Sequence, residues 1–209
     1  MTLTAASEQA QTEVVDLCAE LIRFDTSNPT SDERAAADWV VDRLAEVGIA
    51  SELVESAPGR ASVIARIAGD DTERGALLVH GHLDVVPADA AEWQVPPFSG
   101  EIRDGYLWGR GAIDMKDTVA VMLATARHFA RTGTKPARDV VLAFLADEEA
   151  GGKFGAHWLV EHRPDLFSGV TEAIGGGGGV GVARHDNPRG EPQGKAHRRL
   201  GGVGGHRER

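Results

Sequence analysis

Two imidazoles and a carboxylate follow a short apolar run in the stretch LLVHGHLDVVP, residues 77–87. The run reads as a buried strand, and His80, His82 and Asp84 then come at two-residue spacing. Residues at i and i+2 lie on the same side of a strand, so His82 and Asp84 can face one site together. Asp84 can alternatively orient another histidine, or support the site as a whole. Taken alone, the motif is more simply a structural histidine beside a turn aspartate.

Carboxylates also follow two later segments of the chain. Asp114 lies in GRGAIDMK, where Gly109 and Gly111 allow the backbone to approach a neighbouring group closely, and it could also cap the next helix. Glu148 and Glu149 end the apolar run VVLAFLA in the stretch LADEEAGG, where two buried carboxylates would repel one another. A nearby cation relieves that repulsion, with one glutamate binding the ion and the other remaining available as a base.

One imidazole together with several carboxylates is a ligand set typical of a divalent metal ion. The set suits zinc, with cobalt or manganese as alternatives. A carboxylate such as Asp114 can bridge two ions about 3.5–4 Å apart in hydrolytic sites with two metals. A metal-free acid–base site around Glu148 and Glu149 is the competing interpretation.

Helices and apolar strands alternate along the first 175 residues. The apolar spacing predicts helices over about 7–24, 32–47 and 115–131, and a shorter helix in KFGAHWLVEHR. Strands are predicted in IASELVE, ASVIARIA, GALLVHGH and RDVVLAFLA, and Asp104-Gly105 reads as a tight hairpin turn. This alternation is typical of an α/β fold with a largely parallel sheet flanked by helices. Functional residues of such sheets gather beyond the carboxyl ends of the strands, where we expect the three polar stretches to meet.

Composition and charge restrict the partners and the compartment. The formal net charge of −10 disfavours nucleic acid or an anionic membrane surface. The single cysteine, Cys18, permits no disulfide framework and is expected to be a buried thiol. We identify no signal peptide, and no apolar run approaches the roughly 20 residues of a membrane span. These features predict a soluble cytoplasmic protein with no nucleic-acid partner and no membrane partner.

The last 34 residues differ in composition from the rest of the chain. Residues 176–209 hold 11 of the 26 glycines, and seven Lys or Arg against three Asp or Glu give them a net charge of +4. They contain no aromatic residue and few large aliphatic ones. Such a segment buries too little surface to offset the entropy lost on ordering, so it is predicted to be disordered.

In this order and spacing, HGHLDVVP, GYLWGRGAIDMK and LADEEAGG resemble the motifs of the M20 family of metallopeptidases and deacylases. The stretches LIRFDTSNP and WQVPPFSG are also similar to that family. The resemblance covers about residues 10–175. It implies a zinc-peptidase-like catalytic domain that hydrolyses an amide bond in a peptide or an N-acyl amino acid.

The resemblance also implies a role for each matching residue. His82 would be a ligand of one of two zinc ions, Glu149 a ligand of the other, and Asp114 the ligand that bridges both. Asp84 and Glu148 would be the catalytic residues. Asp84 would support the site beside His82, whereas Glu148 would be the general base that takes a proton from the attacking water and returns it to the leaving amine.

No role falls to His80, which is expected to be structural.

The sequence departs from the family pattern after residue 175. An acidic ligand is expected some 27 positions past the glutamate pair, where this chain has Gly176, and Glu172 is the nearest acid. The family also has a further histidine ligand and an inserted lid and dimerisation domain, which we expect to lie beyond residue 209. The tail histidines could be offered as replacement ligands, but solvated disorder is the simpler interpretation of their composition.

We therefore expect residues 1–175 to form the N-terminal part of an incomplete catalytic domain, and residues 176–209 a disordered or out-of-frame tail. The chain as given is predicted to be a truncated and inactive amide hydrolase. A homodimer is expected only with the lid domain. The alternative is a catalytically dead metal-binding or interaction fragment.

Overall fold

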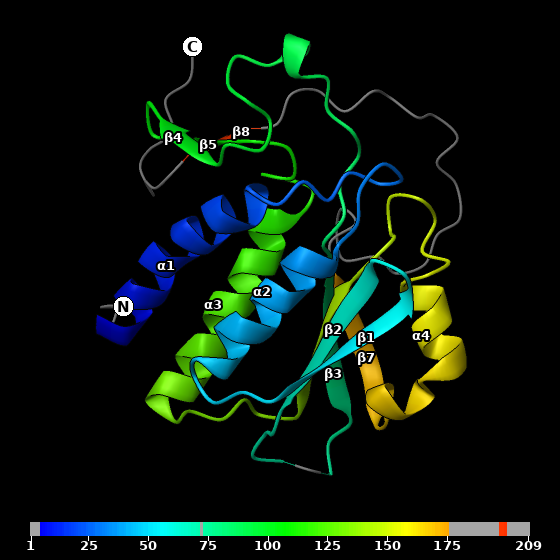
Figure 1. Cartoon of the computed structure of the whole chain (residues 1–209). Coiled ribbons are helices and arrows are strands. Elements are labelled where there is room, and N and C mark those ends of the chain that lie inside the picture. The colour runs from blue at the N-terminus through cyan, green and yellow to red at the C-terminus, as the bar shows by residue number, and fades with distance from the viewer. Residues whose placement is uncertain (1–4, 72, 176–196, 200–209) are drawn as a thin grey trace, which may run out of the picture.

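The computed structural model describes residues 5–71, 73–175 and 197–199 (Figure 1). Its elements, in chain order, are α1 (Ala5–Ile22), α2 (Arg34–Ala45), β1 (Ser51–Ala57), β2 (Arg60–Ile67), β3 (Ala76–His82), the 3-10 helix η1 (Ala90–Glu92), β4 (Glu101–Arg103), β5 (Tyr106–Trp108), α3 (Lys116–Thr132), β6 (Val140–Leu145), α4 (Ala156–His162), the 3-10 helix η2 (Pro164–Phe167), β7 (Val170–Gly175) and β8 (His197–Arg199). The three long helices predicted from apolar spacing are confirmed, and their ends lie within two residues of the predicted ones.

Five strands form the main sheet in the order β1-β2-β6-β3-β7. β3 is parallel to β6 and β7, whereas β2 is antiparallel to β1 and β6. The predicted α/β class is confirmed, and the sheet is mixed because β2 alone runs opposite to the other four strands, so that its pairings with β1 and β6 are antiparallel. The cause is the two-residue turn at Pro58 and Gly59, where Gly59 has a φ of 80° and β1 folds back onto β2 as a hairpin.

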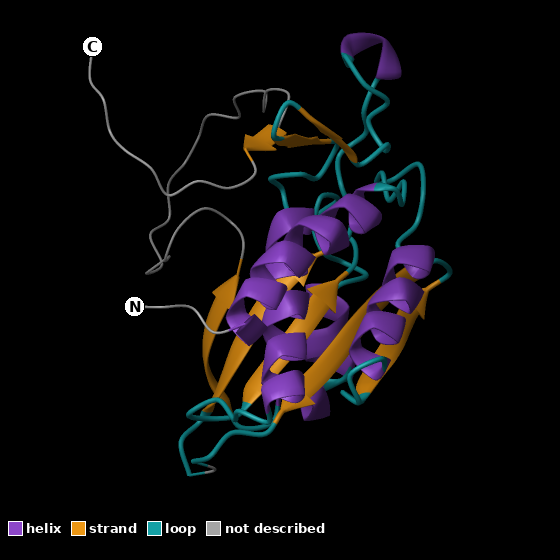
Figure 2. Ribbon diagram, turned by 90° about the vertical axis from the view of Figure 1, so that its left-hand side faces the viewer, coloured by secondary structure: helices purple, strands orange, loops and turns teal. Residues whose placement is uncertain are grey.

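Helices cover both faces of the main sheet, with α1, α2 and α3 on one face and α4 on the other (Figures 1 and 2). β6 contributes to both cores, because successive side chains of a strand point to opposite faces. Leu142 and Phe144 pack with α1, α2 and α3, whereas Val141, Ala143 and Leu145 pack with α4 and η2. Burial on both faces explains why this strand is a continuous apolar run in the sequence.

A second, smaller sheet contains the hairpin of β4 and β5 together with β8. Its turn is Asp104-Gly105, as predicted, with φ values of 54° and 76°. Asp114 therefore does not follow a strand of the main sheet, which corrects the prediction from the sequence. It lies in the loop between β5 and α3, and this loop approaches the segment after β3 closely. A Cβ added at Gly111, where φ is 84°, would lie 2.9 Å from Cγ1 of Val85.

Three further sequence predictions concern Cys18, membrane-spanning segments and residues 176–209. Cys18 is buried in α1, as expected. Within the described residues, no helix is long and apolar enough to cross a membrane. The predicted disorder of residues 176–209 cannot be compared along most of that segment, because residues 176–196 and 200–209 lie outside the described part of the chain. The three described residues of the segment form β8.

A buried lysine joins α3 to α1. Lys116 is the first residue of α3, and its side chain is fully buried. Its Nζ donates hydrogen bonds to the main-chain oxygens of Leu21, at 3.0 Å, and Phe24, at 2.8 Å. Burial lowers the pKa of Lys116 to about 7. The two bonds satisfy carbonyl groups at the C-terminal end of α1, which have no partner within the helix. Lys116 therefore fixes how the first helix ends.

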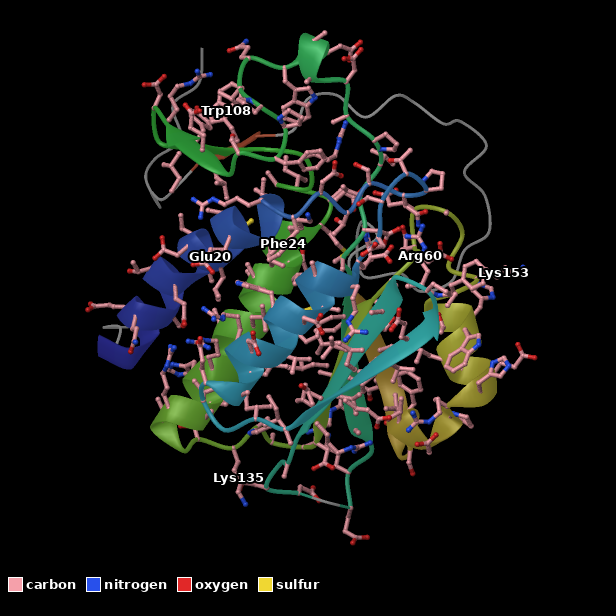
Figure 3. All side chains as sticks on the ribbon, viewed as in Figure 1. Glu20, Phe24, Arg60, Trp108, Lys135 and Lys153 are labelled. Atoms are coloured by element: carbon pink, nitrogen blue, oxygen red, sulfur yellow. The ribbon has the colours of Figure 1, made fainter. Side chains whose placement is uncertain are left out.

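A fully buried carboxyl group precedes α2. Oε1 of Glu33 accepts hydrogen bonds from Nη1 of Arg60, at 2.7 Å, and from the main-chain N–H of Asp147, at 3.3 Å (Figure 3 labels Arg60). Oε2 of Glu33 has no hydrogen-bond partner among the described groups. Burial raises the pKa of Glu33 to about 7, an increase that Arg60 opposes and the charge of Asp84 enlarges. The folded protein therefore favours the protonated acid.

Replacing Lys116 by methionine tests the link between α1 and α3. Lys116→Met keeps most of the side-chain volume but removes both donors, which leaves the carbonyl oxygen of Phe24 without its Lys116 partner and that of Leu21 with only the main-chain N–H of Phe24. We expect the free energy of unfolding to fall by about 1–3 kcal/mol, as measured by urea denaturation with circular dichroism. The control is Lys135→Met at an exposed loop position after α3 (Figure 3 labels Lys135), where we expect the free energy of unfolding to change by no more than about 0.5 kcal/mol. Equal loss in both variants would contradict the role of Lys116.

The raised pKa of Glu33 predicts a pH dependence of stability. Between the ordinary value of 4.5 and the folded value of about 7, the folded state holds this proton more tightly than the unfolded chain. Glu33 therefore makes the free energy of unfolding fall as pH rises through this window, by about 1.4 kcal/mol per pH unit. Glu33→Gln cannot ionise, so its stability relative to wild type should rise between pH 5 and pH 7 and then level off. A stability difference that stays constant from pH 4 to pH 8 in urea denaturation would refute this.

Candidate metal centre

Three potential ligands meet at the carboxyl edge of the main sheet. β3 and β6 are parallel neighbours with His82 opposite Leu145, so the two strands end side by side. At this edge His82, Asp114 and Glu149 each offer a ligand atom, and the three atoms lie within 4.8 Å of one another. Among the described residues this is the only such cluster of three or more His, Cys, Asp or Glu side chains. Its members come from the end of β3, the loop before α3 and the turn after β6.

His82 is buried and held from one side of its ring. Nδ1 lies 2.9 Å from the main-chain oxygen of Asp84, and in the neutral ring donation of Nδ1–H to this carbonyl leaves the lone pair on Nε2. Nε2 lies 3.2 Å from Oδ1 of Asp114 and 3.7 Å from Oε2 of Glu148. Burial alone would lower the pKa of His82, but the hydrogen bonds and charge of Asp84 outweigh it and raise the pKa to about 9. The ring thus presents one nitrogen toward several carboxylates.

Asp114 faces this nitrogen with a half-exposed carboxylate. The residue at the N-cap of α3 is Met115, and no side chain caps the helix there. The interpretation of Asp114 as a helix cap is therefore wrong, and its carboxylate is available to the cluster.

The carboxylate of Asp84 lies 3.5 Å from Nδ1 of His82 and holds the turn that carries the glutamates. Its carboxylate is fully buried and accepts hydrogen bonds from the main-chain N–H groups of Glu148, at 3.0 Å, and Glu149, at 2.9 Å. Nδ2 of Asn28 donates a further bond at 3.0 Å. Burial tends to raise the pKa of Asp84, but the hydrogen bonds from His82, Asn28 and Glu149 outweigh it and lower the pKa. Asp84 therefore connects the end of β3 to the turn after β6.

The two adjacent glutamates occupy different environments. Glu148 is more than half exposed, with its carboxylate near His82, whereas Glu149 is partly buried. Burial raises the pKa of Glu149, as do the charges of Asp114, Glu148 and Asp84, although His82 opposes the increase. The pair lies in a turn and not on a helix, so the two carboxylates can serve different partners.

The charges at the site fit a divalent cation. Asp84, Asp114, Glu148 and Glu149 surround one imidazole, and within the described part of the chain no Lys or Arg forms an ion pair with any of the four. Like charges gathered at a partly buried edge repel one another, which a bound cation would offset. One imidazole nitrogen and two carboxylate oxygens form a donor set suited to zinc, cobalt or manganese.

His80 lies outside the cluster, in an apolar cavity of about 290 Å³ between the sheet and α4. Leu78, Leu145, Val160 and Phe167 are among the residues that line it. Burial lowers the pKa of His80. This environment favours a neutral ring and agrees with the expectation that His80 is structural.

Two buried polar residues at the site have no role in the predictions from sequence. They are Asn28 and Asp147. In the structure Nδ2 of Asn28 also donates to Oδ1 of Asp147, at 3.0 Å. The signal that could have identified Asn28 is a polar amide in the stretch DTSNP, which already resembled the family.

Glu172, the acid nearest the expected ligand position, forms an ion pair with Arg138, and Gly176 lies outside the described residues.

Three relatives are between 31% and 38% identical to this chain over the aligned residues. An N-fatty-acyl-amino acid synthase/hydrolase of Xenopus tropicalis is 31% identical over 165 residues, which cover 76% of this chain and 32% of that protein. Aminoacylase-1 of Sus scrofa is 32% identical, covering 73% of this chain and 37% of that protein. A succinyl-diaminopimelate desuccinylase of Paracoccus denitrificans is 38% identical, covering 69% and 37% respectively.

Solved structures share the fold at low sequence identity. Human carnosine dipeptidase 1 superposes with a TM-score of 0.68 at 23% identity and covers 80% of this chain and 39% of that one. An M20 family metallo-carboxypeptidase of Sulfolobus solfataricus gives 0.68 at 24% identity, covering 80% and 38%. A dinuclear metal binding peptidase from the M20 family in Bacillus subtilis gives 0.57 at 18% identity, covering 80% and 43%.

The chain spans 32–37% of the length of the three relatives compared by sequence. The model of peptidase family M20/M25/M40 matches residues 78–188, which is more than half of the 209 residues. This chain therefore belongs to peptidase family M20/M25/M40.

Proposed function

We propose that this chain carries the metal centre of a metal-dependent amide hydrolase, acting on peptides or N-acyl amino acids. The observation that supports this most directly is the convergence of His82, Asp114 and Glu149 within 4.8 Å at the edge of the sheet. Membership of a peptidase family supports a hydrolytic reaction. The substrate classes follow the names of the similar proteins, which include an aminoacylase, a desuccinylase and a dipeptidase.

His82, Asp114 and Glu149 are the residues proposed to hold the ion. Zinc is the proposed metal, with cobalt or manganese as alternatives, and two ions per site are proposed with Asp114 as the bridge. When bound, such an ion polarises the substrate carbonyl and lowers the pKa of water. His82 contributes Nε2, because Nδ1 is directed to the carbonyl oxygen of Asp84. The half-exposed carboxylate of Asp114 leaves the site open to solvent and substrate.

Glu148 is proposed as the general base. It is the more exposed of the two glutamates, and Oε2 lies 3.7 Å from Nε2 of His82, so a water or substrate at the cluster is within reach. Its carboxylate takes a proton from the attacking water and passes it to the leaving nitrogen. Asp84 keeps this carboxylate in place, because it holds the main-chain N–H groups of Glu148 and Glu149.

Residues 1–209 alone are proposed to bind metal without efficient turnover. Catalytic zinc normally has three protein ligands, and the described residues supply three for one ion while two ions are proposed. The inactive metal-binding fragment is therefore the second candidate function for this chain. A cytoplasmic location stays a prediction from sequence, as does a homodimer that requires further residues.

A titration with Co²⁺ tests the proposed ligands, because this ion reports its ligands by its visible absorption. The protein of residues 1–209 should bind Co²⁺ with a visible spectrum typical of bound metal. His82→Ala and Glu149→Ala should each weaken Co²⁺ binding by more than about 100-fold. Loss of a residue that only supports a metal ligand costs up to that much affinity, so loss of a ligand itself should cost more. His162→Ala, which removes an exposed imidazole on α4, is the matched control and should change nothing. Wild-type affinity in His82→Ala would refute the assignment.

The glutamate pair should separate metal binding from catalysis. Glu148→Ala should leave the Co²⁺ affinity nearly unchanged, in contrast to Glu149→Ala. In any form of the protein that hydrolyses an N-acyl amino acid or a dipeptide, Glu148→Ala should lower kcat by about 10²-fold or more. Loss of metal with Glu148→Ala but not with Glu149→Ala would mean that the two roles are reversed.

An activity assay tests the proposal for the chain by itself. Residues 1–209, supplied with Zn²⁺ or Co²⁺, should hydrolyse neither N-acyl amino acids nor dipeptides at a rate above the metal-only control. Robust metal-dependent turnover by the folded protein would show that the residues present complete the site.

A further inference from the structure

The segment between α1 and α2 runs along the residues that follow β3. Ser27 and Val85 form a parallel bridge, and the main-chain N–H of Asn28 donates to the carbonyl of Val85 at 2.9 Å. Oγ1 of Thr26 donates to the carbonyl of Leu83 at 2.7 Å. These bonds fix the backbone on both sides of Asp84, and they bring the side chain of Asn28 to the edge where the candidate metal centre lies.

The amide of Asn28 lies between two buried carboxylates. Nδ2 donates to Oδ2 of Asp84 and to Oδ1 of Asp147, each at 3.0 Å. An amide nitrogen carries two hydrogens, so both donors are used. The exposed fractions are 5% for Asn28, 0% for Asp84 and 3% for Asp147, so water cannot easily replace either bond.

The two carboxylates hold the turn that carries Glu148 and Glu149 from both of its ends. Asp84 accepts the main-chain N–H groups of the two glutamates. Asp147 accepts the N–H of Phe154 at 2.9 Å through Oδ2, and its own N–H donates to Glu33. Asp147 also has a φ of 65°, a left-handed conformation that is unfavourable for a residue other than glycine and persists only where its surroundings hold it.

We propose that Asn28 is a positioning residue of the metal centre, whose amide joins Asp84 to Asp147 and so fixes the turn that presents Glu148 and Glu149. The inference rests on the proposed function, since it concerns how the ligands are held. It assigns a role to a segment that neither the ligand set nor the general base requires.

The chemistry of the position requires an amide and not a carboxylate. An aspartate has the shape of asparagine but no donor, so Asn28→Asp would place a third carboxylate against two buried ones. In the described part of the chain no Lys or Arg forms an ion pair with Asp84 or Asp147 that could offset the added charge. The aspartates that the same segment does contain, Asp25 and Asp32, are both exposed.

The test measures metal binding by variants of residues 1–209, with Co²⁺ as the probe. Asn28→Asp should raise the Kd for Co²⁺ by about 10- to 100-fold, the effect typical of losing a residue that orients metal ligands. At saturating Co²⁺ its visible spectrum should differ from that of wild type, because the geometry around the ion changes. Thr30→Asp adds the same charge to the same segment at an exposed position and should bind like wild type.

A double variant distinguishes positioning from general destabilisation. In Asn28→Asp combined with Asp147→Asn, an amide at position 147 can again donate to a carboxylate at position 28, so part of the lost affinity should return. If Asn28→Asp does not fold, Asn28→Ser supplies one hydroxyl donor and should show an intermediate Kd and a changed spectrum. Thermal unfolding without metal is recorded for each variant, so that a loss of fold is not mistaken for a loss of affinity.

Each outcome has a distinct meaning. Wild-type affinity and spectrum in a folded Asn28→Asp or Asn28→Ser variant would overturn the positioning role, as would an equal loss in Thr30→Asp or no recovery in the double variant. Failure of the wild type itself to bind Co²⁺ would overturn the proposed function and, with it, the positioning role.

Discussion

The buried carboxylate of Asp84 is the interaction on which the site depends. It belongs to the segment after β3, yet its two oxygens accept the main-chain N–H groups of Glu148 and Glu149 after β6. A carboxylate is a stronger acceptor than a neutral group, and these bonds are shielded from water. Parallel pairing of β3 and β6 brings the strand ends together, and Asp84 then fixes how the chain leaves the second strand. Without this carboxylate, the turn that carries the glutamates would be held only from its other end, through Asp147.

The sequence allowed the strand-end chemistry to be predicted because the apolar runs are long and the polar residues follow them directly. β3 and β6 are buried on both faces or nearly so, and their ends therefore reveal where polar side chains can gather. The direction of the strands was harder to predict. Apolar spacing identifies a strand but not its partner, and the hairpin at Pro58 and Gly59 made half of the sheet's pairings antiparallel.

Long-range polar contacts were the part that the sequence could not provide. Asn28 lies 56 positions from Asp84 and 119 from Asp147, and no local pattern connects them. Asp114 does lie near His82 and Glu149, but not for the predicted reason, since it lies in a loop after the hairpin of the second sheet and not at the end of a main-sheet strand. Its proximity to His82 depends on the close approach of the loop at Gly111 to the segment after β3.

The contrast between Asp84 and Glu149 shows how one small region separates structural from ligand-type carboxylates. Both are removed from solvent to some extent, which by itself raises the pKa of a carboxyl group. Asp84 has N–H donors on both oxygens, and they lower its pKa, so its negative charge is kept. Glu149 faces Asp114 and Glu148 instead, and its pKa is raised. The negative charge of Asp84, which holds the turn, is thus stabilised by hydrogen bonds. The negative charge that lacks such stabilisation lies on the side chains that face the cluster, where a cation can offset it. The cluster is thus held in shape by hydrogen bonds that do not require an ion, and a cation would offset the repulsion among the proposed ligands.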